Sequence, residues 1–442
     1  MLKWSRYSHL FLSERNGWLL YNAAAGSFMK LMDGQEKIVE AVREDPEEYD
    51  FSDCPQLYIL LRSSGHLVTE GQDDDLYNIL KMRRQTAQYA GNVLLLTVAI
   101  TRNCNFDCSY CFEGNRTGMP MTEEVEDKLV AFIQKFKARH RFITWYGGEP
   151  LLAFDRILSI DRKLKALELP YRGMLVTNGF LLDERVIREL DNLHILIIQI
   201  TLDGAKKTHD ARRVLNGGGP TFDRIVKNLD TLMCSNYKGK VHIRVNVDAR
   251  NEDEFMDVFR LIRDRYPKDE RIMVYPGFVT GDAHPDASCF FDSDSKGRFV
   301  ANVLKKHGVS PMSLFPSSPA AGCTLTKRNA FVVGPDGELY KCWNDVGIPE
   351  AVVGHIDSFT DWNVARIARG MVAASYLDDE ECRQCFYFPV CDGGCHQARM
   401  KNLEDGGKRD VCSYFKHHLD ELLELHYEQK QRQERENADA AQ

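Results

Sequence analysis

The sequence predicts an α/β protein with a parallel sheet at its centre, a small module before the sheet and a cysteine-rich region after it. Over residues 91–300, short apolar runs alternate with charged, helix-like stretches, which is the pattern of successive β-α units. The first run, residues 93–100, is continuously apolar, as is typical of a strand buried on both faces of a parallel sheet. Seven of the thirteen cysteines follow residue 320, which sets the last third apart chemically.

Length and composition narrow the class of protein. The 442 residues are enough for roughly two or three domains, and 43% hydrophobic with 28% charged residues is typical of a soluble globular protein. A net charge of −8 argues against a nucleic-acid binder. We find no uncharged apolar stretch of about 18 residues and no apolar signal region at the N-terminus, so we expect no membrane span and a cytoplasmic protein.

The first 90 residues predict a small module of mixed structure. Asn16-Gly17 lies between two aromatic-rich runs and is a hairpin signal. The order hairpin, helices, short strand is winged-helix-like. The predicted elements are strands over residues 7–13 and 18–22, one or two helices over 27–43, a helix over 57–63, a strand over 65–68 and a charged helix over 73–89.

Six β-α units are predicted in the central region. Residues 122–139 carry acids in the first turn of an amphipathic pattern, which favours a helix. The predicted strands are residues 93–100, 141–146, 172–176, 194–202, 240–247 and 271–275, and further helices are expected over residues 183–193, 222–234 and 253–266.

Three cysteines, Cys104, Cys108 and Cys111, follow the first predicted strand in a C-x3-C-x2-C pattern. They lie where the strand's carboxyl end is expected, and α/β proteins build their sites at that edge. A structural zinc site or a closed cluster needs four ligands. Three thiolates on a cubane iron–sulfur cluster leave one iron open. The alternatives are three buried small side chains or half of a zinc knuckle.

Polar motifs end the next three predicted strands. Gly147-Gly148-Glu149-Pro150 follows the second strand, Thr177-Asn178-Gly179 the third and Thr201-Leu202-Asp203-Gly204 the fourth. Two glycines let backbone carbonyls approach an ammonium group, and a carboxylate offsets its charge. Each motif read alone is also an ordinary turn or helix cap.

The cysteine-rich end carries seven cysteines at regular spacings. Because the total of thirteen is odd and a reducing cytosol disfavours disulfides, we interpret them as metal or cluster ligands; zinc is the alternative. Cys54, Cys234 and Cys289 stand apart from any motif. The seven are Cys323, Cys342, Cys382, Cys385, Cys391, Cys395 and Cys412.

The first cysteine motif, with Tyr110 before its last cysteine, resembles that of the radical S-adenosylmethionine (SAM) superfamily. The seven later cysteines match the SPASM pattern C-x(9–15)-G-x4-C, gap, C-x2-C-x5-C-x3-C-xn-C, with Gly337 as its glycine. The resemblance covers roughly residues 91–415. It implies a partial (β/α)6 barrel over 91–300 and a SPASM domain over 301–415, between a winged-helix-like module over 1–90 and a C-terminal helix with a disordered tail over 416–442.

The resemblance also implies a role for each site residue. Cys104, Cys108 and Cys111 would hold the catalytic 4Fe–4S cluster, and Gly147, Gly148 and Glu149 the amino group of SAM. Thr201 would contact the ribose and Arg213, through a bidentate fork, the SAM carboxylate. One auxiliary 4Fe–4S cluster would use Cys382, Cys385, Cys391 and Cys412, and the other Cys323, Cys342 and Cys395. One cluster with three protein ligands and two with four need eleven, and the motifs supply ten cysteines. Either Cys289 supplies the missing ligand, or one iron stays open and could bind a substrate thiolate.

By this resemblance the protein cleaves SAM reductively, and the 5′-deoxyadenosyl radical takes a hydrogen from a ribosomally made precursor peptide. The expected product is a thioether crosslink, as in sactipeptide and ranthipeptide synthases. A flavodoxin or ferredoxin would supply electrons. Residues 1–90 would capture the leader of the peptide as an added strand; the alternative is a packing subdomain that binds no peptide.

Other functions remain open from the sequence. An anaerobic sulfatase maturase is the runner-up, although about a hundred residues precede the cysteine loop here. In addition, Trp343 stands where those enzymes tend to carry aspartate, with Asp345 two residues later. Carbon–carbon crosslinking and epimerisation are further options. An iron–sulfur electron carrier without SAM chemistry is the alternative of another class, and the Gly147-Gly148-Glu149-Pro150 motif argues against it.

Overall fold

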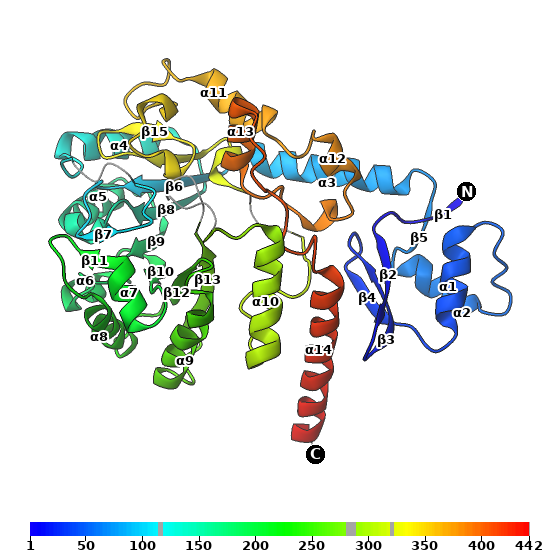
Figure 1. The fold of residues 1–442 in the computed structure, drawn as a ribbon. Coiled ribbons are helices and arrows are strands. Elements are labelled where there is room, and N and C mark those ends of the chain that lie inside the picture. Colours follow the sequence, from blue (N-terminus) through cyan, green and yellow to red (C-terminus); the bar gives the residue numbers. More distant parts are fainter. Residues whose placement is uncertain (114–117, 280–288, 319–321, 442) are drawn as a thin grey trace. The chain divides into compact units, whose positions relative to one another are not determined.

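The computed structural model describes residues 1–442 except 114–117, 280–288, 319–321 and 442. The chain forms two compact units (Figure 1). The first unit combines Met1–Gln88, Asp292–Cys323 and Ala374–Gln442, and the second combines Tyr89–Phe291 and Thr324–Ala373. These units divide the chain differently from the predicted domain boundaries, because each is assembled from segments that are distant in sequence.

A nine-stranded sheet forms the centre of the second unit. Its strand order is β13-β12-β10-β9-β8-β6-β14-β15-β16. The first six of these are parallel, and from β6 to β13 they follow one another across the sheet as they do along the chain. This arrangement confirms the predicted parallel α/β sheet. The six are β6 (Val93–Ala99), β8 (His140–Tyr146), β9 (Arg172–Thr177), β10 (Ile195–Thr201), β12 (Lys240–Val247) and β13 (Ile272–Phe278).

Three further strands extend this sheet beyond β6. β14 (Ala330–Val333) pairs parallel to β6, and β15 (Glu338–Tyr340) returns antiparallel and pairs with β16 (Gly354–His355). β14 and β15 therefore form a hairpin. Its attachment to a strand more than 200 residues earlier was not predicted, since no local pattern indicates such a partner.

Helices connect the parallel strands, as predicted. Thr122 caps α4 by accepting the Val125 amide at 3.3 Å, and Glu126 is fully buried against Arg156 and Lys163 of α5. This buried carboxylate holds the first two helices together. The helices are α4 (Glu123–Lys135), α5 (Phe154–Ala166), α6 (Glu184–Glu189), α7 (Lys206–Arg212), α8 (Phe222–Met233), α9 (Phe255–Arg265) and α11 (Val364–Ala368).

The N-terminal part of the first unit contains two small sheets and three helices. The predicted hairpin is confirmed as β2 (Ser8–Ser13) and β3 (Gly17–Asn22). The helix predicted from residue 27 is wrong at its start, because residues 27–30 form a third strand paired with β3. Asn22 accepts the amides of the next turn and Gly26 has φ +64°, so the chain reverses there. The other elements are β4 (Ser27–Lys30), β1 (Leu2–Trp4) paired with β5 (Leu67–Thr69), α1 (Gln35–Glu44), α2 (Pro55–Ser63) and α3 (Gln72–Tyr89).

This N-terminal sheet shares its hydrophobic core with the C-terminal third of the chain. Tyr7, Leu19 and Tyr21 pack in one buried cluster with side chains from residues 376–388 and from α14. The Tyr77 hydroxyl donates to the carbonyl of Leu377 at 2.6 Å. The C-terminal helices of the unit are α10 (Ser293–His307), α12 (Glu380–Gln384), α13 (His396–Asp405) and α14 (Leu419–Ala441).

The predicted disordered tail is wrong for the described residues, because α14 continues to Ala441. Its last turns are rich in Gln, Glu, Lys and Arg, which are good helix formers. Residue 442 lies outside the described part of the chain. Within that part, no helix combines the length and the apolar character that crossing a membrane requires.

A buried histidine should make the first unit sensitive to acid. His66 is fully buried, its Nδ1 lies 2.9 Å from the Ser8 hydroxyl, and burial lowers its pKa from 6.5 to about 4. The unfolded chain therefore binds a proton that the folded chain does not, so stability falls as the pH drops from 6.5 towards 4, by about 3 kcal/mol in all. Urea unfolding at pH 7 and pH 5 measures this loss, and in His66→Gln most of it should disappear. An equal loss in the variant would contradict the prediction.

Candidate active site

The cysteine loop is fastened to the glycine motif by backbone contacts. The amides of Gly148 and Glu149 donate to the carbonyls of Thr101 and Asn103 at 3.0 and 2.9 Å. A Cβ on Gly147 would lie 2.2 Å from the Thr101 carbonyl oxygen, and one on Gly148 would lie 2.4 Å from that of Asn103. Gly147 also has φ +130°. Both glycines are therefore required for the loop to dock, in addition to any role towards a ligand.

A short antiparallel ribbon fixes the other side of the loop. β7 (Phe106–Cys108) pairs with β11 (Arg213–Leu215), and Arg213 is the direct partner of Cys108. Sequence reasoning missed this ribbon because three-residue strands leave no periodic signal. The pairing brings together the two motifs that the sequence singled out separately.

Glu149 links the ends of β8 and β9. It is fully buried, and its carboxylate accepts hydrogen bonds from the Thr177 hydroxyl at 2.7 Å and the Asn178 amide at 2.7 Å. It also accepts the Leu151 amide at 3.0 Å. Burial raises the pKa of Glu149, and these donors act in the opposite direction. The Asn178 side chain in turn donates to Asn105 in the cysteine loop at 2.8 Å, so Thr177-Asn178 supports the loop as well.

The buried Arg213 and the half-buried Tyr110 form a polar pair beside the loop. Arg213 Nη1 donates to the Tyr110 hydroxyl at 2.7 Å, and Asn246 Nδ2 donates to the same oxygen at 3.0 Å. Thr201 is buried at the end of β10. Among the described residues, Arg213 Nε and Asp203 Oδ1 are buried without a hydrogen-bond partner. A polar ligand carrying both an acceptor and a donor would satisfy them, so these residues fit SAM.

His209, on α7 just before Arg213, has a structural role. Its Nδ1 accepts the Asp203 amide at 3.1 Å, and its Nε2 lies 3.1 Å from the Thr221 hydroxyl. That hydroxyl donates to the carbonyl of Arg213 at 2.7 Å. Burial lowers the pKa of His209 well below its usual value, so the ring is neutral and joins three segments.

The three loop cysteines are the predicted ligands of the catalytic cluster. Among the described residues, no three His, Cys, Asp or Glu side chains converge as a single metal ion requires. In a cubane cluster each thiolate binds its own iron, so the sulfur atoms stay apart. The Phe106 amide points at Cys104 Sγ from 3.4 Å. Burial raises the pKa of the Cys104 thiol to about 12, and a bound cation would favour the thiolate form.

The later cysteines in the first unit also carry N–H donors aimed at sulfur. Arg399 Nη2 donates to Cys382 Sγ at 3.1 Å, and the Gly393 amide donates to Cys391 Sγ at 3.3 Å. Lys416 Nζ lies 3.4 Å from Cys412 Sγ. Such donors stabilise thiolates, so this set fits a cluster. Sequence reasoning missed Arg399 and Lys416, although both follow a motif cysteine by four residues.

Arg399 is expected to tune the redox potential of a cluster on Cys382. Replacing it with glutamine removes a positive charge from a ligand sulfur, which disfavours the reduced cluster. We expect the potential to fall by on the order of 59 mV, the equivalent of a tenfold change in a one-electron equilibrium. Electron paramagnetic resonance titration measures it. The exposed Lys430 of α14, changed to glutamine, is the control, and an equal shift there would contradict the assignment.

The remaining predicted ligands are divided between the two units. Cys342 follows β15 in the second unit, whereas Cys323 and Cys395 belong to the first. Cys289, the candidate fourth ligand, is buried in the second unit. Trp343, next to Cys342, stacks on Tyr146 with ring centroids 6.4 Å apart. The ligand set Cys323, Cys342 and Cys395 stays a prediction.

Comparison with known proteins agrees with the geometry of the loop. Residues 98–262 match the family model of the radical SAM superfamily. The cysteine-type anaerobic sulfatase-maturating enzyme of Clostridium perfringens strain 13 is 24% identical over 354 residues, spanning 73% of this chain and 94% of that protein. The serine-type enzyme of Bacteroides thetaiotaomicron is 24% identical over 380 residues, spanning 75% and 90%.

Two solved structures share the fold. Streptococcus suis SuiB bound to the precursor peptide SuiA has a TM-score of 0.54 at 16% identity, covering 94% of this chain and 100% of that one. The enzyme anSMEcpe with bound AdoMet has a TM-score of 0.57 at 19% identity, covering 76% and 97%. The chain therefore contains a radical SAM domain over residues 98–262 and is an enzyme related in sequence to the sulfatase-maturating enzymes. Its fold is similar to that of SuiB.

Proposed function

We propose that this enzyme modifies a ribosomally made precursor peptide and forms an intramolecular thioether crosslink. One observation carries the proposal. The match to SuiB, a protein crystallised with a precursor peptide, covers 94% of this chain. The sulfatase maturases span only 69–79% of it. This wider coverage supports a chain architecture like that of SuiB.

The loop residues would hold the reactive groups. A 4Fe–4S cluster on Cys104, Cys108 and Cys111, with SAM on its open iron, supplies one-electron cleavage of SAM to a 5′-deoxyadenosyl radical. Gly147 and Gly148 set the position of the loop, and Glu149 holds the ends of β8 and β9 in register with it. Arg213 would donate its unpartnered Nε–H to the SAM carboxylate, and the buried Thr201 would contact the ribose.

We further propose two auxiliary 4Fe–4S clusters. Cys382, Cys385, Cys391 and Cys412 would bind one, supported by the donors from Arg399, Gly393 and Lys416. Cys323, Cys342 and Cys395 would bind the other, with either Cys289 or a substrate thiolate as the fourth ligand. Anaerobic reconstitution should load about twelve iron atoms per chain, and a stable count near eight would remove one cluster.

The N-terminal module would capture the leader of the peptide. Its winged-helix-like order of elements and the edges of its small sheets suit an added strand. The six parallel strands would form the partial (β/α)6 barrel around SAM, and a flavodoxin or ferredoxin would supply electrons. Crosslinking of a leaderless peptide at an unchanged KM would contradict leader capture.

A sulfatase maturase is the second candidate function. The sequence matches to cysteine-type and serine-type maturases favour it, because they extend over 89–94% of those proteins. In that case the substrate is a sulfatase peptide, and the product is formylglycine rather than a crosslink.

One anaerobic experiment separates these functions. The reconstituted enzyme is incubated with SAM, dithionite and either a cysteine-bearing peptide encoded beside its gene or a sulfatase-derived peptide. A thioether product loses two hydrogens and resists thiol alkylation, whereas formylglycine reacts with a hydrazide label. If neither peptide changes but 5′-deoxyadenosine forms, the substrate assignment is wrong. If no 5′-deoxyadenosine forms, the SAM chemistry is wrong too.

A further inference from the structure

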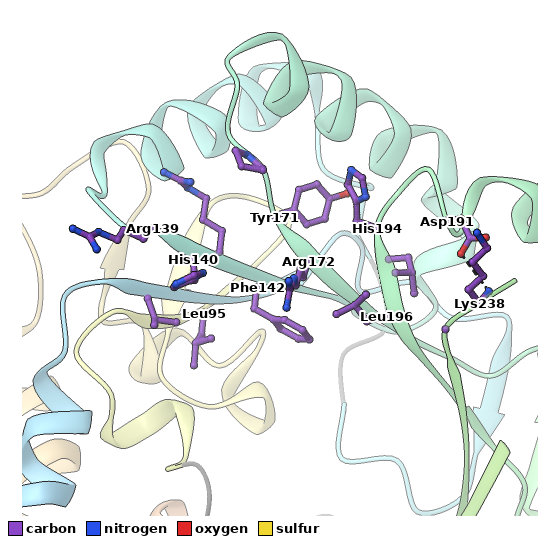
Figure 2. A pocket seen from close by; sticks show the side chains of 15 residues that line it. Leu95, Arg139, His140, Phe142, Tyr171, Arg172, Asp191, His194, Leu196 and Lys238 are labelled. Carbon is purple, nitrogen blue, oxygen red and sulfur yellow. Dashed lines mark hydrogen bonds between the residues drawn. The ribbon is translucent and has the colours of Figure 1, made fainter. Parts of the chain in front are cut away.

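A cavity lies in the second unit, at the ends of the strands that are opposite to the cysteine loop. It has a volume of about 750 Å³ and lies at the amino ends of β6, β8, β9, β10 and β12 within the second unit (Figure 2). The loop with Cys104 and the glycine motif instead follow the carboxyl ends of these strands. The cavity is therefore separate from the proposed SAM site.

The cavity has an excess of positive charge. Four cationic side chains line it, Arg139, Arg141, Arg172 and Lys238, against the single carboxylate of Asp191. Over the part of the chain that the structure describes, none of the four forms an ion pair. The protein as a whole has a net charge of −8, so like charges are gathered here without compensation from the protein itself.

Asp191 and Arg141 sharpen this imbalance. The Asp191 carboxylate accepts the backbone amide of Lys238 at 3.4 Å, so this acid is engaged with the loop. Arg141 Nε is buried without a hydrogen-bond partner among the described residues. An unsatisfied buried donor costs roughly 1–3 kcal/mol, and a bound acceptor would remove that cost. His140 and His194 add two further nitrogen-bearing rings to the lining.

An apolar surface lies beside these charges. The strand register places Leu95 opposite Phe142, and Phe142 opposite Arg172. In Figure 2 these three side chains lie on the same side of the sheet, with Leu196 next to them. A hydrocarbon side chain, an aromatic ring and a guanidinium therefore stand in a row across three strands.

We propose that this cavity binds a phosphate-bearing small molecule of about the size of a mononucleotide. Arginine forks match phosphate oxygens and lysine adds a point charge, while the Leu95–Phe142 surface suits a flat or apolar body. A volume of about 750 Å³ falls within the range of 300–1,000 Å³ that small-ligand pockets occupy. The concave shape favours such a ligand over an acidic protein, whose contact surface is broad and flatter.

ATP is the probe for this cavity, and the protein is the full-length reconstituted enzyme. Saturating SAM is present, so that the proposed SAM site is already filled and does not bind the nucleoside part of ATP. Isothermal titration calorimetry should show one saturable ATP site whose affinity falls as salt rises. Arg172→Gln, and separately Arg141→Gln, should weaken ATP binding by about tenfold each. Arg224→Gln is the matched control, because Arg224 is an exposed residue of α8 outside the cavity lining. The Arg224→Gln variant should bind ATP as tightly as the wild type does.

Two further probes define what is recognised. Pyrophosphate should compete with ATP and adenosine should compete only weakly, since the cations dominate the site. The proposal is overturned if ATP does not saturate at millimolar concentration, if Arg172→Gln and Arg141→Gln bind as tightly as Arg224→Gln, or if adenosine competes as well as pyrophosphate. It is also overturned if polyglutamate displaces ATP but pyrophosphate does not, which would assign the cavity to an acidic polypeptide. Thermal unfolding of each variant verifies that it is folded. Because Arg172 is exposed, its substitution should not change the unfolding temperature.

Discussion

Gly148→Ala should reduce the production of 5′-deoxyadenosine by at least about a hundredfold. The new Cβ would lie 2.4 and 2.5 Å from the carbonyl oxygens of Asn103 and Arg102. Those oxygens belong to the backbone and cannot turn aside, so the cysteine loop must move. Overpacking of this kind costs about 3 kcal/mol or more, and a shift of about 1 Å in a reacting group is enough to lose two orders of magnitude in rate. Anaerobic turnover with chromatographic detection of 5′-deoxyadenosine measures the effect.

Gly91→Ala provides the control for this substitution. Gly91 has open space around its Cβ position and no positive φ, and it lies two residues before β6. We expect wild-type turnover and iron content from it. Full activity in Gly148→Ala would show that the glycine motif is not needed to dock the loop, and the structural account of the site would fail.

Removing residues 1–88 should cost the enzyme the cluster proposed on Cys382, Cys385, Cys391 and Cys412, and not only its affinity for a leader. Tyr7, Leu19 and Tyr21 are fully buried in the core that also contains Phe388 and Leu377. Losing several large buried side chains at about 2–5 kcal/mol each exceeds the stability of most domains. Iron analysis should show about four fewer atoms per chain. An intact iron count would show that the cysteine-rich segment folds alone.

A single residue tests the same packing more gently. Arg84 Nη2 donates to the carbonyls of Phe388 and Pro389 at 2.8 and 3.1 Å, between Cys385 and Cys391. Arg84→Met should destabilise the first unit by about 2–3 kcal/mol, because two buried acceptors lose a charged donor. The neighbouring Arg83 is exposed, and Arg83→Met should leave stability within about 0.5 kcal/mol of the wild type. Arg84→Met keeps the N-terminal residues and the cluster ligands, so leader affinity can be measured with the clusters in place. The truncation of residues 1–88 does not allow that measurement.

The sequence predicts the second unit well where the signal is local and repeated. Runs of five to nine residues rich in apolar side chains indicated all six parallel strands, because the strands of a parallel sheet are largely buried. The same reasoning failed at residues 27–30. Phe28, Leu31 and Met32 have helical spacing, yet pairing with β3 decides the conformation. Tertiary contacts outweigh local preference in such short segments.

Parts of the site that depend on distant pairings were not accessible from the sequence. Nothing near Cys108 indicates that it pairs with Arg213, about a hundred residues later. The two glycines were interpreted through an ammonium ligand, whereas the structure shows that Thr101, Arg102 and Asn103 leave no room for a side chain. The basic cavity was missed because its four cations come from the starts of three separate strands, β8, β9 and β12, where each charge alone resembles ordinary surface.

The discontinuous make-up of the first unit affects how the protein is synthesised. Its N-terminal strands emerge from the ribosome first, but Leu419 and Leu423, which complete their core, are translated more than 370 residues later. At about 5–20 residues per second, the exposed apolar faces of β2 and β3 must wait for at least about 20 seconds. The second unit, which needs nothing after residue 373, is able to fold during that time. We therefore expect chaperones to bind the nascent N-terminal strands, and iron–sulfur assembly on the C-terminal cysteines to follow release of the chain.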